Sequence, residues 1–358
     1  MAPSIRRVAQ KESATLTLGD IDLYLYLIDE GVLTVEDPRF EPLRSAGLKL
    51  FACAFFLTAS LTDIIKVVYH KAIDVLPLRA RVALEYLLVH RRWPNLEHPQ
   101  TFNEKITWRK LYDRDPRMPD LVDKVKAKEI VARKFGRDLV IPTLRVYDTA
   151  EELDFNVPPL SQPPYVLKTN HGSTFNIFIK DRSFDPKAIR EKLAAFLKVN
   201  YGDFKQEWAY AQVPRKILVE PYIETPEGYT IPDYKFHVFA GVVYAIQLVI
   251  DRFKSYRINF YDRDWNLLDI RGYGKRPRFD GAIPPPARLP DMIKLAEALG
   301  KDFPYVRVDL YEINREIKFG ELTFYTTSGF DRFDPPEWDY KFGQQWKQDW
   351  NAPEVRHS

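Results

Sequence analysis

Charged side chains alternate with apolar ones in two short runs near the C-terminus, residues 306–311 and 317–324. Alternation of this kind predicts two strands, because successive side chains on a strand point to opposite faces. The Asn-Arg pair at 314–315 lies between the runs and predicts the turn of a hairpin. Polar residues of each run then share one face: Arg307, Asp309, Glu321 and Thr323.

A face with two carboxylates, a hydroxyl and an arginine is unsuited to a dry core, where an unpaired charge costs several kcal/mol. Oxygen ligands at this spacing suit Mg²⁺, which takes one or two carboxylates and completes its octahedron with water and phosphate oxygens. Asp309, Glu321 and Thr323 are therefore the candidate metal ligands, and Arg307 would hold a phosphoryl or carboxylate oxygen. The alternative is a hairpin with one solvated face and a surface salt bridge.

A second candidate is Lys168, which ends an apolar strand and is followed by the turn 170–174. Phosphate oxygens would be held here by the lysine and by backbone N–H groups, which can come close because Gly172 has no Cβ. Ser173 belongs to the same turn, and His171 is a polar turn residue and not a general base. The alternative is a surface lysine before an ordinary hairpin turn.

The run 217–223 combines a buried strand, an acid and an extended exit. A flat purine could pair with the backbone of Tyr222 and Ile223 as a neighbouring strand would, and Glu220 could accept from its amine. Taken alone, Glu220 also fits a charge at a strand end.

The run 233–239 places Asp233, Lys235 and His237 on one strand face. Further polar residues follow on neighbouring strands: Arg252, Arg257 and Asn259. We expect these clusters and the hairpin to face one way, because solvation alone does not explain so many polar strand faces. Together they describe a site for a polyphosphate and a metal, with cations left for a second anion.

The elements that must position these residues are strands and helices in alternation. Strands are predicted at 140–142, 165–169, 176–180, 217–220, 234–239, 242–250 and 256–261. Helices are predicted to begin at residue 101, with Thr101 and Glu104 as a capping box, at residue 124, capped by Asp123, and at residue 149. Further helices are expected around 189–197 and 289–299. The pattern indicates an α+β fold, preceded by an α-helical region over residues 1–93.

Bulk composition limits the classes of partner. The 53 basic and 50 acidic residues leave a net charge of +3, which offers no electrostatic footprint for nucleic acid. Cys53 is the only cysteine, so no intrachain disulfide forms and a reducing compartment is expected.

The longest uncharged run, residues 50–62, is shorter than the roughly 18 to 20 residues that cross a bilayer. A buried helix is expected there, and a helix on a membrane surface is the alternative.

In their order, these motifs carry a family resemblance: DK at 123–124, the strand, lysine and turn at 168–173, VEPYI at 219–223, DYK at 233–235 and RVD…GELT at 307–323. This order resembles the ATP-grasp superfamily. TFNEKITW, VLKTNHGS, DYKFHVF and FGELTFYTTSGF resemble its TupA-like branch, named for teichuronopeptide synthesis. The likeness covers residues 94–347.

The resemblance implies a fold in which two α+β lobes clasp ATP between antiparallel sheets. It implies the boundaries 94–164 for the N-terminal part of the unit, 165–225 for the lid lobe, 226–347 for the catalytic lobe and 348–358 for a tail. Lys124 and Lys168 would bind phosphates beneath the 170–174 turn, and adenine would lie against Glu220, Tyr222 and Ile223.

Further roles follow from the same resemblance. Asp233 would bind ribose and Lys235 phosphate, while Asp309 and Glu321 would ligate Mg²⁺. Arg252, Arg257 and Asn259 resemble the arginine and RxN elements of RimK-like ligases, and Arg307 would steady an acyl phosphate. One departure is Thr323, where most ATP-grasp ligases have asparagine, so a hydroxyl would supply the third oxygen.

The implied activity is ATP-dependent formation of an amide from a carboxylate and an amine, through an acyl phosphate. An amino acid joined to a uronic acid of a surface polysaccharide is the expected product class, and the cytoplasm or the inner face of the membrane is the expected place. The alternatives are a kinase of the same architecture, a glycosyltransferase and a nucleotide-binding scaffold. The helical region at 1–93 would dock to a protein or a membrane.

Overall fold

The computed structural model describes residues 76–223, 231–250, 257–281, 283–348 and 350. The chain divides into two units, Met1–Ile73 and Asp74–Ser358, and the structure below is that of the second unit. The helices expected before residue 76 and the apolar run 50–62 lie outside the described residues. Within them, no helix has the length and apolarity that crossing a membrane requires.

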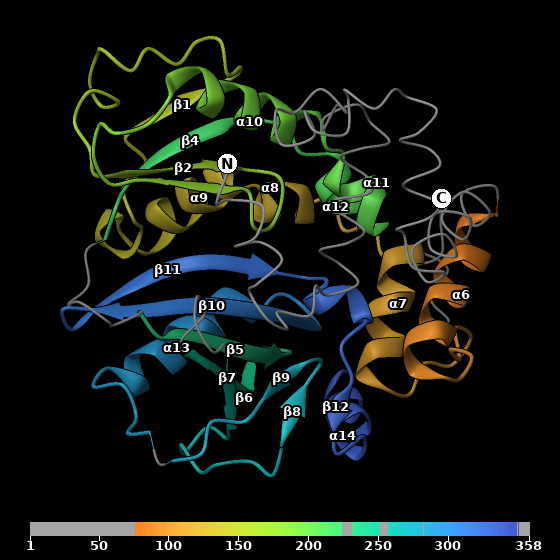
Figure 1. Ribbon diagram of the computed structural model, residues 1–358. Coiled ribbons are helices and arrows are strands. Elements are labelled where there is room, and N and C mark those ends of the chain that lie inside the picture. Colours follow the sequence, from red (N-terminus) through yellow and green to blue (C-terminus); the bar gives the residue numbers. More distant parts are fainter. Residues whose placement is uncertain (1–75, 224–230, 251–256, 282, 349, 351–358) are drawn as a thin grey trace, which may run out of the picture. The chain divides into compact units, whose positions relative to one another are not determined.

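A five-stranded antiparallel sheet forms the centre of this unit (Figure 1). Its strand order is β11-β10-β5-β6-β7. The strands are β5 (Asp233–Phe239), β6 (Val242–Ile250), β7 (Arg257–Tyr261), β10 (Tyr305–Ile313) and β11 (Glu316–Thr323). The predicted hairpin is β10 and β11, and its turn residues Asn314 and Arg315 have φ of 52° and 64°. The run 307–323 therefore pairs with itself and with β5.

Each face of this sheet is covered by helices. One face packs in a core with α13 (Leu289–Gly300), α8 (Met118–Val122) and α9 (Lys124–Phe135). The other face carries an aromatic core that includes α7 (Phe102–Tyr112) and α14 (Glu337–Gln345). Because both faces are covered, every residue of β5 is buried, including the polar ones that alternate with its apolar and aromatic residues.

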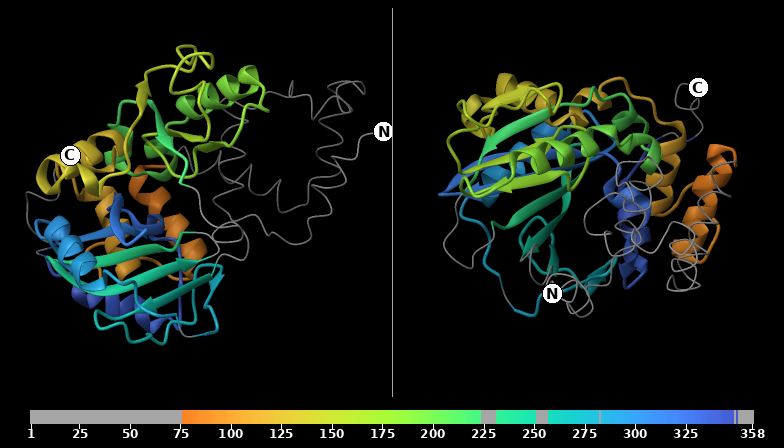
Figure 2. Two further views of the ribbon diagram at one scale, coloured as in Figure 1. Left: turned by 90° about the vertical axis from the view of Figure 1, so that its left-hand side faces the viewer. Right: turned by 45° about the horizontal axis from the view of Figure 1, so that its top comes forward.

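A four-stranded antiparallel sheet forms a second layer, seen from two directions in Figure 2. Its order is β1-β4-β2-β3, with β1 (Arg145–Tyr147), β4 (Ile217–Pro221), β2 (Tyr165–Thr169) and β3 (Asn176–Ile179). Helix α10 (Pro186–Lys198) covers one face, and Leu193 is buried in the core between them. The predicted strands at 165–169, 176–180 and 217–220 are confirmed.

Two local predictions are wrong. Residues 140–142 form no strand; Val140 makes only an isolated bridge to Phe319, and the strand begins later, at Arg145. Residues 149–153 form turns and no helix. Both runs are too short for periodicity to decide between a strand, a helix and a turn, and tertiary contacts made the choice.

The remaining elements are short or flank the sheets. They are α6 (Leu78–His90), η2 (Arg137–Leu139), α11 (Tyr201–Lys205), α12 (Trp208–Ala211), η3 (Thr326–Gly329) and the small sheet β12-β8-β9, made of β12 (Phe333–Asp334), β8 (Gly272–Tyr273) and β9 (Arg276–Pro277).

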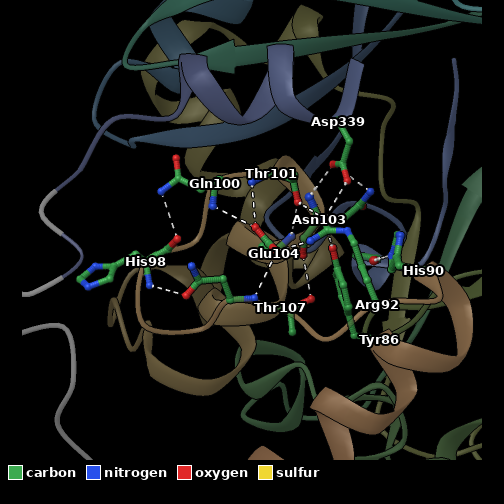
Figure 3. A network of polar contacts seen from close by, with 12 residues as sticks. Tyr86, His90, Arg92, His98, Gln100, Thr101, Asn103, Glu104, Thr107 and Asp339 are labelled. Carbon is green, nitrogen blue, oxygen red and sulfur yellow. Dashed lines mark hydrogen bonds and ion pairs between the residues drawn. The ribbon is translucent and has the colours of Figure 1, made fainter. Parts of the chain in front are cut away.

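Helix α7 begins with the predicted capping box, which is confirmed: the Thr101 hydroxyl accepts from the Glu104 N–H and the Glu104 carboxylate accepts from the Thr101 N–H. Figure 3 shows the wider network around Glu104, which also accepts from the N–H groups of Asn95 and Gln100 and pairs with Arg92. These bonds satisfy a carboxylate that is 2% exposed, so the helix start is firmly held.

Candidate active site

The hairpin brings its four polar residues into one cluster. The Arg307 guanidinium donates to both Asp309 oxygens, with Nε–Oδ1 of 2.7 Å and Nη2–Oδ2 of 2.8 Å. Its Nη2 also donates to Glu321 Oε1 at 3.0 Å and to the Thr323 hydroxyl at 2.9 Å. Arg307, Asp309 and Thr323 are at most 8% exposed, so the alternative of a solvated hairpin face with a surface salt bridge is wrong.

A β-bulge at Gly320 produces this arrangement. Asp309 pairs with Glu321, the next residue Leu310 pairs with Phe319, and Gly320 is the extra residue between them. In a regular strand Phe319 and Glu321 would share a face; the bulge instead sends Phe319 into the core and Glu321 into the cluster. A Cβ at Gly320 would lie 3.0 Å from the Asp309 carbonyl oxygen, so glycine suits this close approach.

Strand β5 adds Lys235 to the cluster, because Lys235 pairs with Asp309 in the register. The Lys235 ammonium contacts Asp233 at 2.6 Å and also donates to Asp309. Burial opposes its charge, but Asp233 and Asp309 outweigh burial and raise the pKa of Lys235. Burial also opposes the charge of Arg307, but the Asp309 and Glu321 carboxylates outweigh burial and raise the pKa of Arg307. Both cations therefore stay charged beside three carboxylates.

The donor set of the cluster fits Mg²⁺. Its two carboxylates and one hydroxyl are hard oxygen ligands, and the Glu321 side chain is 40% exposed, so an ion can reach it. Among the described residues no three His, Cys, Asp or Glu side chains gather as a self-sufficient metal site. A site with two carboxylates matches Mg²⁺, which shares its coordination with phosphates and water, better than it matches a structural zinc.

Helix α9 and the turn after β2 supply lysines beside this cluster. The Lys124 ammonium donates to the Gly172 carbonyl, and the Lys124 N–H donates to the Asn170 carbonyl at 3.2 Å. Burial lowers the pKa of Lys124, and the nearby Glu321 carboxylate opposes that lowering. Glu321 therefore acts electrostatically on both Lys124 and Arg307, so the turn and the hairpin belong to one charged region.

Lys168 and Glu220 lie on the face of the four-stranded sheet that points away from α10. The Lys168 ammonium contacts one Glu220 oxygen at 2.5 Å, and Lys128 contacts the other at 2.7 Å. Lys128 was missed as a site residue. The sequence did contain a signal for Lys128, because it lies four residues after Lys124 and so shares one face of the helix with it.

Within the turn, His171 is turned inward. Its ring is 1% exposed and its Nε2 contacts the Val199 carbonyl oxygen at 3.1 Å. Burial lowers the pKa of His171 to about 4, so the ring is neutral and anchors the turn. Gly172 allows this packing, because a Cβ there would lie 2.7 Å from the Phe175 ring. Ser173 is exposed on the same turn.

A pocket of about 260 Å³ lies between the end of β4 and the β10–β11 turn. Ile223 and Pro221 line one side of it, and Ile141 and Pro142 another. Ile313 adds to this apolar part, and Asn314, Glu316 and Lys318 form the polar remainder of the lining. Tyr222 does not line the pocket; its ring lies 6.2 Å from the Phe178 ring, edge to face.

Strand β7 does not join the cluster, and the expectation that all polar strand faces point one way is wrong. Lys235 pairs with Gln247, and Gln247 pairs with Phe260, so these three side chains share one face of the sheet. Asn259 is next to Phe260 on β7 and therefore faces the opposite side. Asn259 accordingly donates to the Tyr261 hydroxyl at 3.1 Å and accepts from the Phe279 N–H at 3.1 Å. Arg257 donates to the Arg278 carbonyl at 3.3 Å. Arg252 lies outside the described residues.

Two tyrosines near the cluster were also missed. The Tyr201 and Tyr210 rings meet edge to face at 5.3 Å. Burial raises the pKa of both, and the Glu321 carboxylate adds to that rise. They come from the short helices α11 and α12, whose sequence has no periodicity long enough to place them, so only the fold could show this proximity.

A two-lobed antiparallel α+β unit with acids and lysines gathered between its sheets is the architecture of an ATP-grasp protein. The family model described as TupA-like ATPgrasp matches residues 104–347, more than half of the 358 residues. The chain therefore belongs to this family. The resemblance noted in its motifs is confirmed.

Solved structures of ATP-grasp enzymes also resemble the chain, at low identity. D-alanine–D-alanine ligase from Bacillus anthracis, complexed with ATP, is 17% identical over 57% of this chain and 54% of that one, with a TM-score of 0.33. The ATP-grasp ligase PsnB, complexed with a phosphomimetic precursor variant, Mg and ADP, is 11% identical over 65% and 61%, with a TM-score of 0.36. A RimK domain ATP-grasp protein from Sphaerobacter thermophilus is 16% identical over 75% and 76%, with a TM-score of 0.33.

This chain thus spans little more than half of the D-alanine–D-alanine ligase. Comparison with curated proteins gives no match. The family assignment rests on the family model.

Proposed function

We propose that this protein is an ATP-dependent carboxylate–amine ligase that forms an amide through an acyl phosphate. The observation that carries the proposal is the buried cluster in which Arg307 and Lys235 meet Asp309 and Glu321, next to Lys124. Membership of the TupA-like ATPgrasp family supports the same reading.

The proposed role of each residue follows from the charge of its side chain and from its place in the site. Lys124, Lys168 and Lys235 would bind phosphates, and the 170–174 turn would close over them through its backbone and Ser173. The pocket beside Ile223 would take adenine, with the Tyr222 backbone at its edge, and Asp233 would bind ribose. Asp309, Glu321 and Thr323 would hold Mg²⁺, which when bound neutralises phosphate charge.

In the proposed reaction, a carboxylate oxygen attacks the γ-phosphorus of ATP and the bond to the ADP oxygen breaks. An amine nitrogen then attacks the carbonyl carbon of the acyl phosphate, inorganic phosphate leaves, and the amine gives up a proton. Arg307 would align the acyl phosphate, because its fork already binds carboxylate oxygens in this cluster. Alignment and charge neutralisation suffice, and no side-chain nucleophile is required.

The proposed substrates are a uronic-acid carboxylate and an amino acid, as the teichuronopeptide name of the family suggests. The proposed place is the cytoplasm, where ATP is available. The competing functions are a kinase that phosphorylates a hydroxyl, a glycosyltransferase, and a scaffold that binds a nucleotide without cleaving it.

The test is to screen uronic acids and amino acids while measuring ADP and inorganic phosphate separately. We expect both products, and only when an acid and an amine are present together. Lys168→Ala and Glu321→Ala should each lower turnover about 100-fold or more, because the first removes a cation that would bind phosphate and the second removes a carboxylate that would hold Mg²⁺. Lys126→Ala is the control, because Lys126 is an exposed lysine on α9 paired with Asp120.

The other outcomes separate the competitors. ADP without inorganic phosphate would indicate a kinase, and no ADP under any condition would indicate a scaffold or a glycosyltransferase. Unchanged turnover in Glu321→Ala would count against the proposed metal ligands even if the ligase activity were found.

A further inference from the structure

The Glu220 carboxylate is bonded at both oxygens by lysines. Lys168 contacts Oε2 at 2.5 Å and Lys128 contacts Oε1 at 2.7 Å. Glu220 is 5% exposed and Lys128 is 7% exposed, so this pair is shielded from solvent. The Lys128 ammonium also donates to the Thr143 hydroxyl at 2.8 Å. A continuous chain therefore runs from Thr143 through Lys128 and Glu220 to Lys168.

The two lysines differ in how firmly they are held. Lys128 has a second bond to Thr143, and only 8% of its side chain is exposed. The Lys168 side chain is 26% exposed, and Glu220 is the one hydrogen-bond partner that its ammonium has among the described residues. Lys168 can therefore leave Glu220 for another anion, whereas Lys128 is fixed in place.

We infer that Lys128 is a positioning residue: it keeps Glu220 paired while Lys168 exchanges that carboxylate for the phosphates of a bound nucleotide. The inference rests on the proposed function, in which Lys168 binds phosphate. It also gives Glu220 a role that differs from reading the amine of adenine, since the carboxylate serves as the resting partner of Lys168.

The physical reason is the cost of a buried unpaired charge. If Lys168 left Glu220 with no other cation nearby, a carboxylate would remain buried and unpaired, which is strongly unfavourable. With Lys128 in place, the carboxylate keeps one charged partner throughout. Burial tends to raise the pKa of Glu220, but Lys168 and Lys128 outweigh it and lower that pKa, so the group stays ionised.

The decisive variant is Lys128→Met, which keeps the aliphatic stem and removes the charge. Lys126→Met is its matched control, since Lys126 lies on the same helix with an exposed side chain. We expect Lys128→Met to weaken ATP binding about 10-fold or more, measured by calorimetry, because Lys168 must then leave its only carboxylate unpaired. Lys126→Met should stay within about 2-fold of the wild type.

The kinetic pattern separates positioning from general damage. At saturating ATP, kcat of Lys128→Met should change less than about 3-fold, so that the loss falls on KM for ATP. Lys128→Arg should recover most of the affinity. The double variant Lys128→Met with Glu220→Gln should bind ATP better than Lys128→Met alone, because no unpaired carboxylate is left.

Three results would overturn the inference. One is ATP affinity in Lys128→Met equal to that of Lys126→Met. Another is a fall of kcat and kcat/KM in parallel, which would make Lys128 part of the chemical step. The third is a change of more than about 10-fold in the preference for ATP over GTP in Glu220→Gln, which would make Glu220 a reader of the base. If the wild type itself bound no ATP, that result would refute the proposed function, on which the inference rests.

Discussion

Thr323 is the residue at which this chain departs from the usual ATP-grasp pattern, and its contacts indicate how a hydroxyl would serve in the proposed metal site. The Thr323 hydroxyl accepts from Arg307 at 2.9 Å and donates to Glu321 at 3.0 Å. It thus fixes the Glu321 carboxylate beside the guanidinium. A hydroxyl has a second lone pair, which leaves it able to face a cation as well.

At this scale we predict the effect of Thr323→Val, which keeps the shape of the side chain and removes the oxygen. Turnover with MgATP should fall about 10-fold to 100-fold, because Glu321 loses an orienting bond and the metal loses an oxygen. Thr323→Ser should retain most of the activity. The measurement is the Mg²⁺ dependence of ADP release, and equal Mg²⁺ requirements in Thr323→Val and the wild type would exclude Thr323 as a ligand.

At the scale of elements, strand pairing and helix caps determine where the site residues lie. The bulge at Gly320 turns Glu321 toward Asp309, and the Asp123 cap starts α9 so that Lys124 and Lys128 share one face. The start of helix α7 is held by the network of Figure 3. Its position matters because the buried Arg109 of this helix donates to the carbonyls of Tyr305 and Phe324, which flank the hairpin strands.

The capping network predicts an order of stabilities. Glu104→Ala should lower the free energy of unfolding by about 3 kcal/mol or more, because it frees the N–H groups of Asn95, Gln100 and Thr101 and removes the buried carboxylate that pairs with the partly exposed Arg92. Thr101→Ala should cost about 1 kcal/mol, the usual value of a cap. Asp185→Ala, at the exposed cap of α10, is the control and should cost no more than Thr101→Ala. Urea denaturation measures all three, and a loss in Glu104→Ala no larger than in Asp185→Ala would contradict the prediction.

Across the whole described unit, three histidines lie in separate regions: His171 and His237 are buried and His90 is half-buried. His90 lies at the end of α6, His171 in the turn after β2 and His237 in the central sheet. Burial lowers the pKa of His90 and His171 to about 4, and that of His237 to about 3. All three are therefore neutral in the folded protein at pH 5, where the unfolded chain would protonate them.

The sign of the pH dependence follows. Between the folded and unfolded pKa values the unfolded state binds more protons, so stability rises with pH and is lost as pH falls below about 6.5. Each histidine contributes at most about 1.4 kcal/mol per pH unit in that window. Thermal unfolding at pH 7 and pH 5 measures the effect. His171→Gln should show a smaller loss on acidification than the wild type, and an unchanged loss would refute this assignment.

The alternation of residues in the hairpin, the Asn-Arg turn and the caps at Thr101 and Asp123 could all be predicted from the sequence by itself. These features are local: each depends on the side-chain period of a strand or on bonds within one helical turn. The order of motifs likewise sufficed to predict the ATP-grasp family, because several motifs had to agree at once.

Only the tertiary structure decided which strand faces meet. Asn259 faces away from Lys235 because strand pairing, and not spacing, sets the face that neighbouring strands share. The contact between Lys128 and Glu220 joins residues 92 positions apart, and Tyr201 comes near Glu321 from a separate helix. A sequence pattern contains no information about such distances. In the folded protein they matter, because a buried charge is stable only where a suitable partner lies beside it.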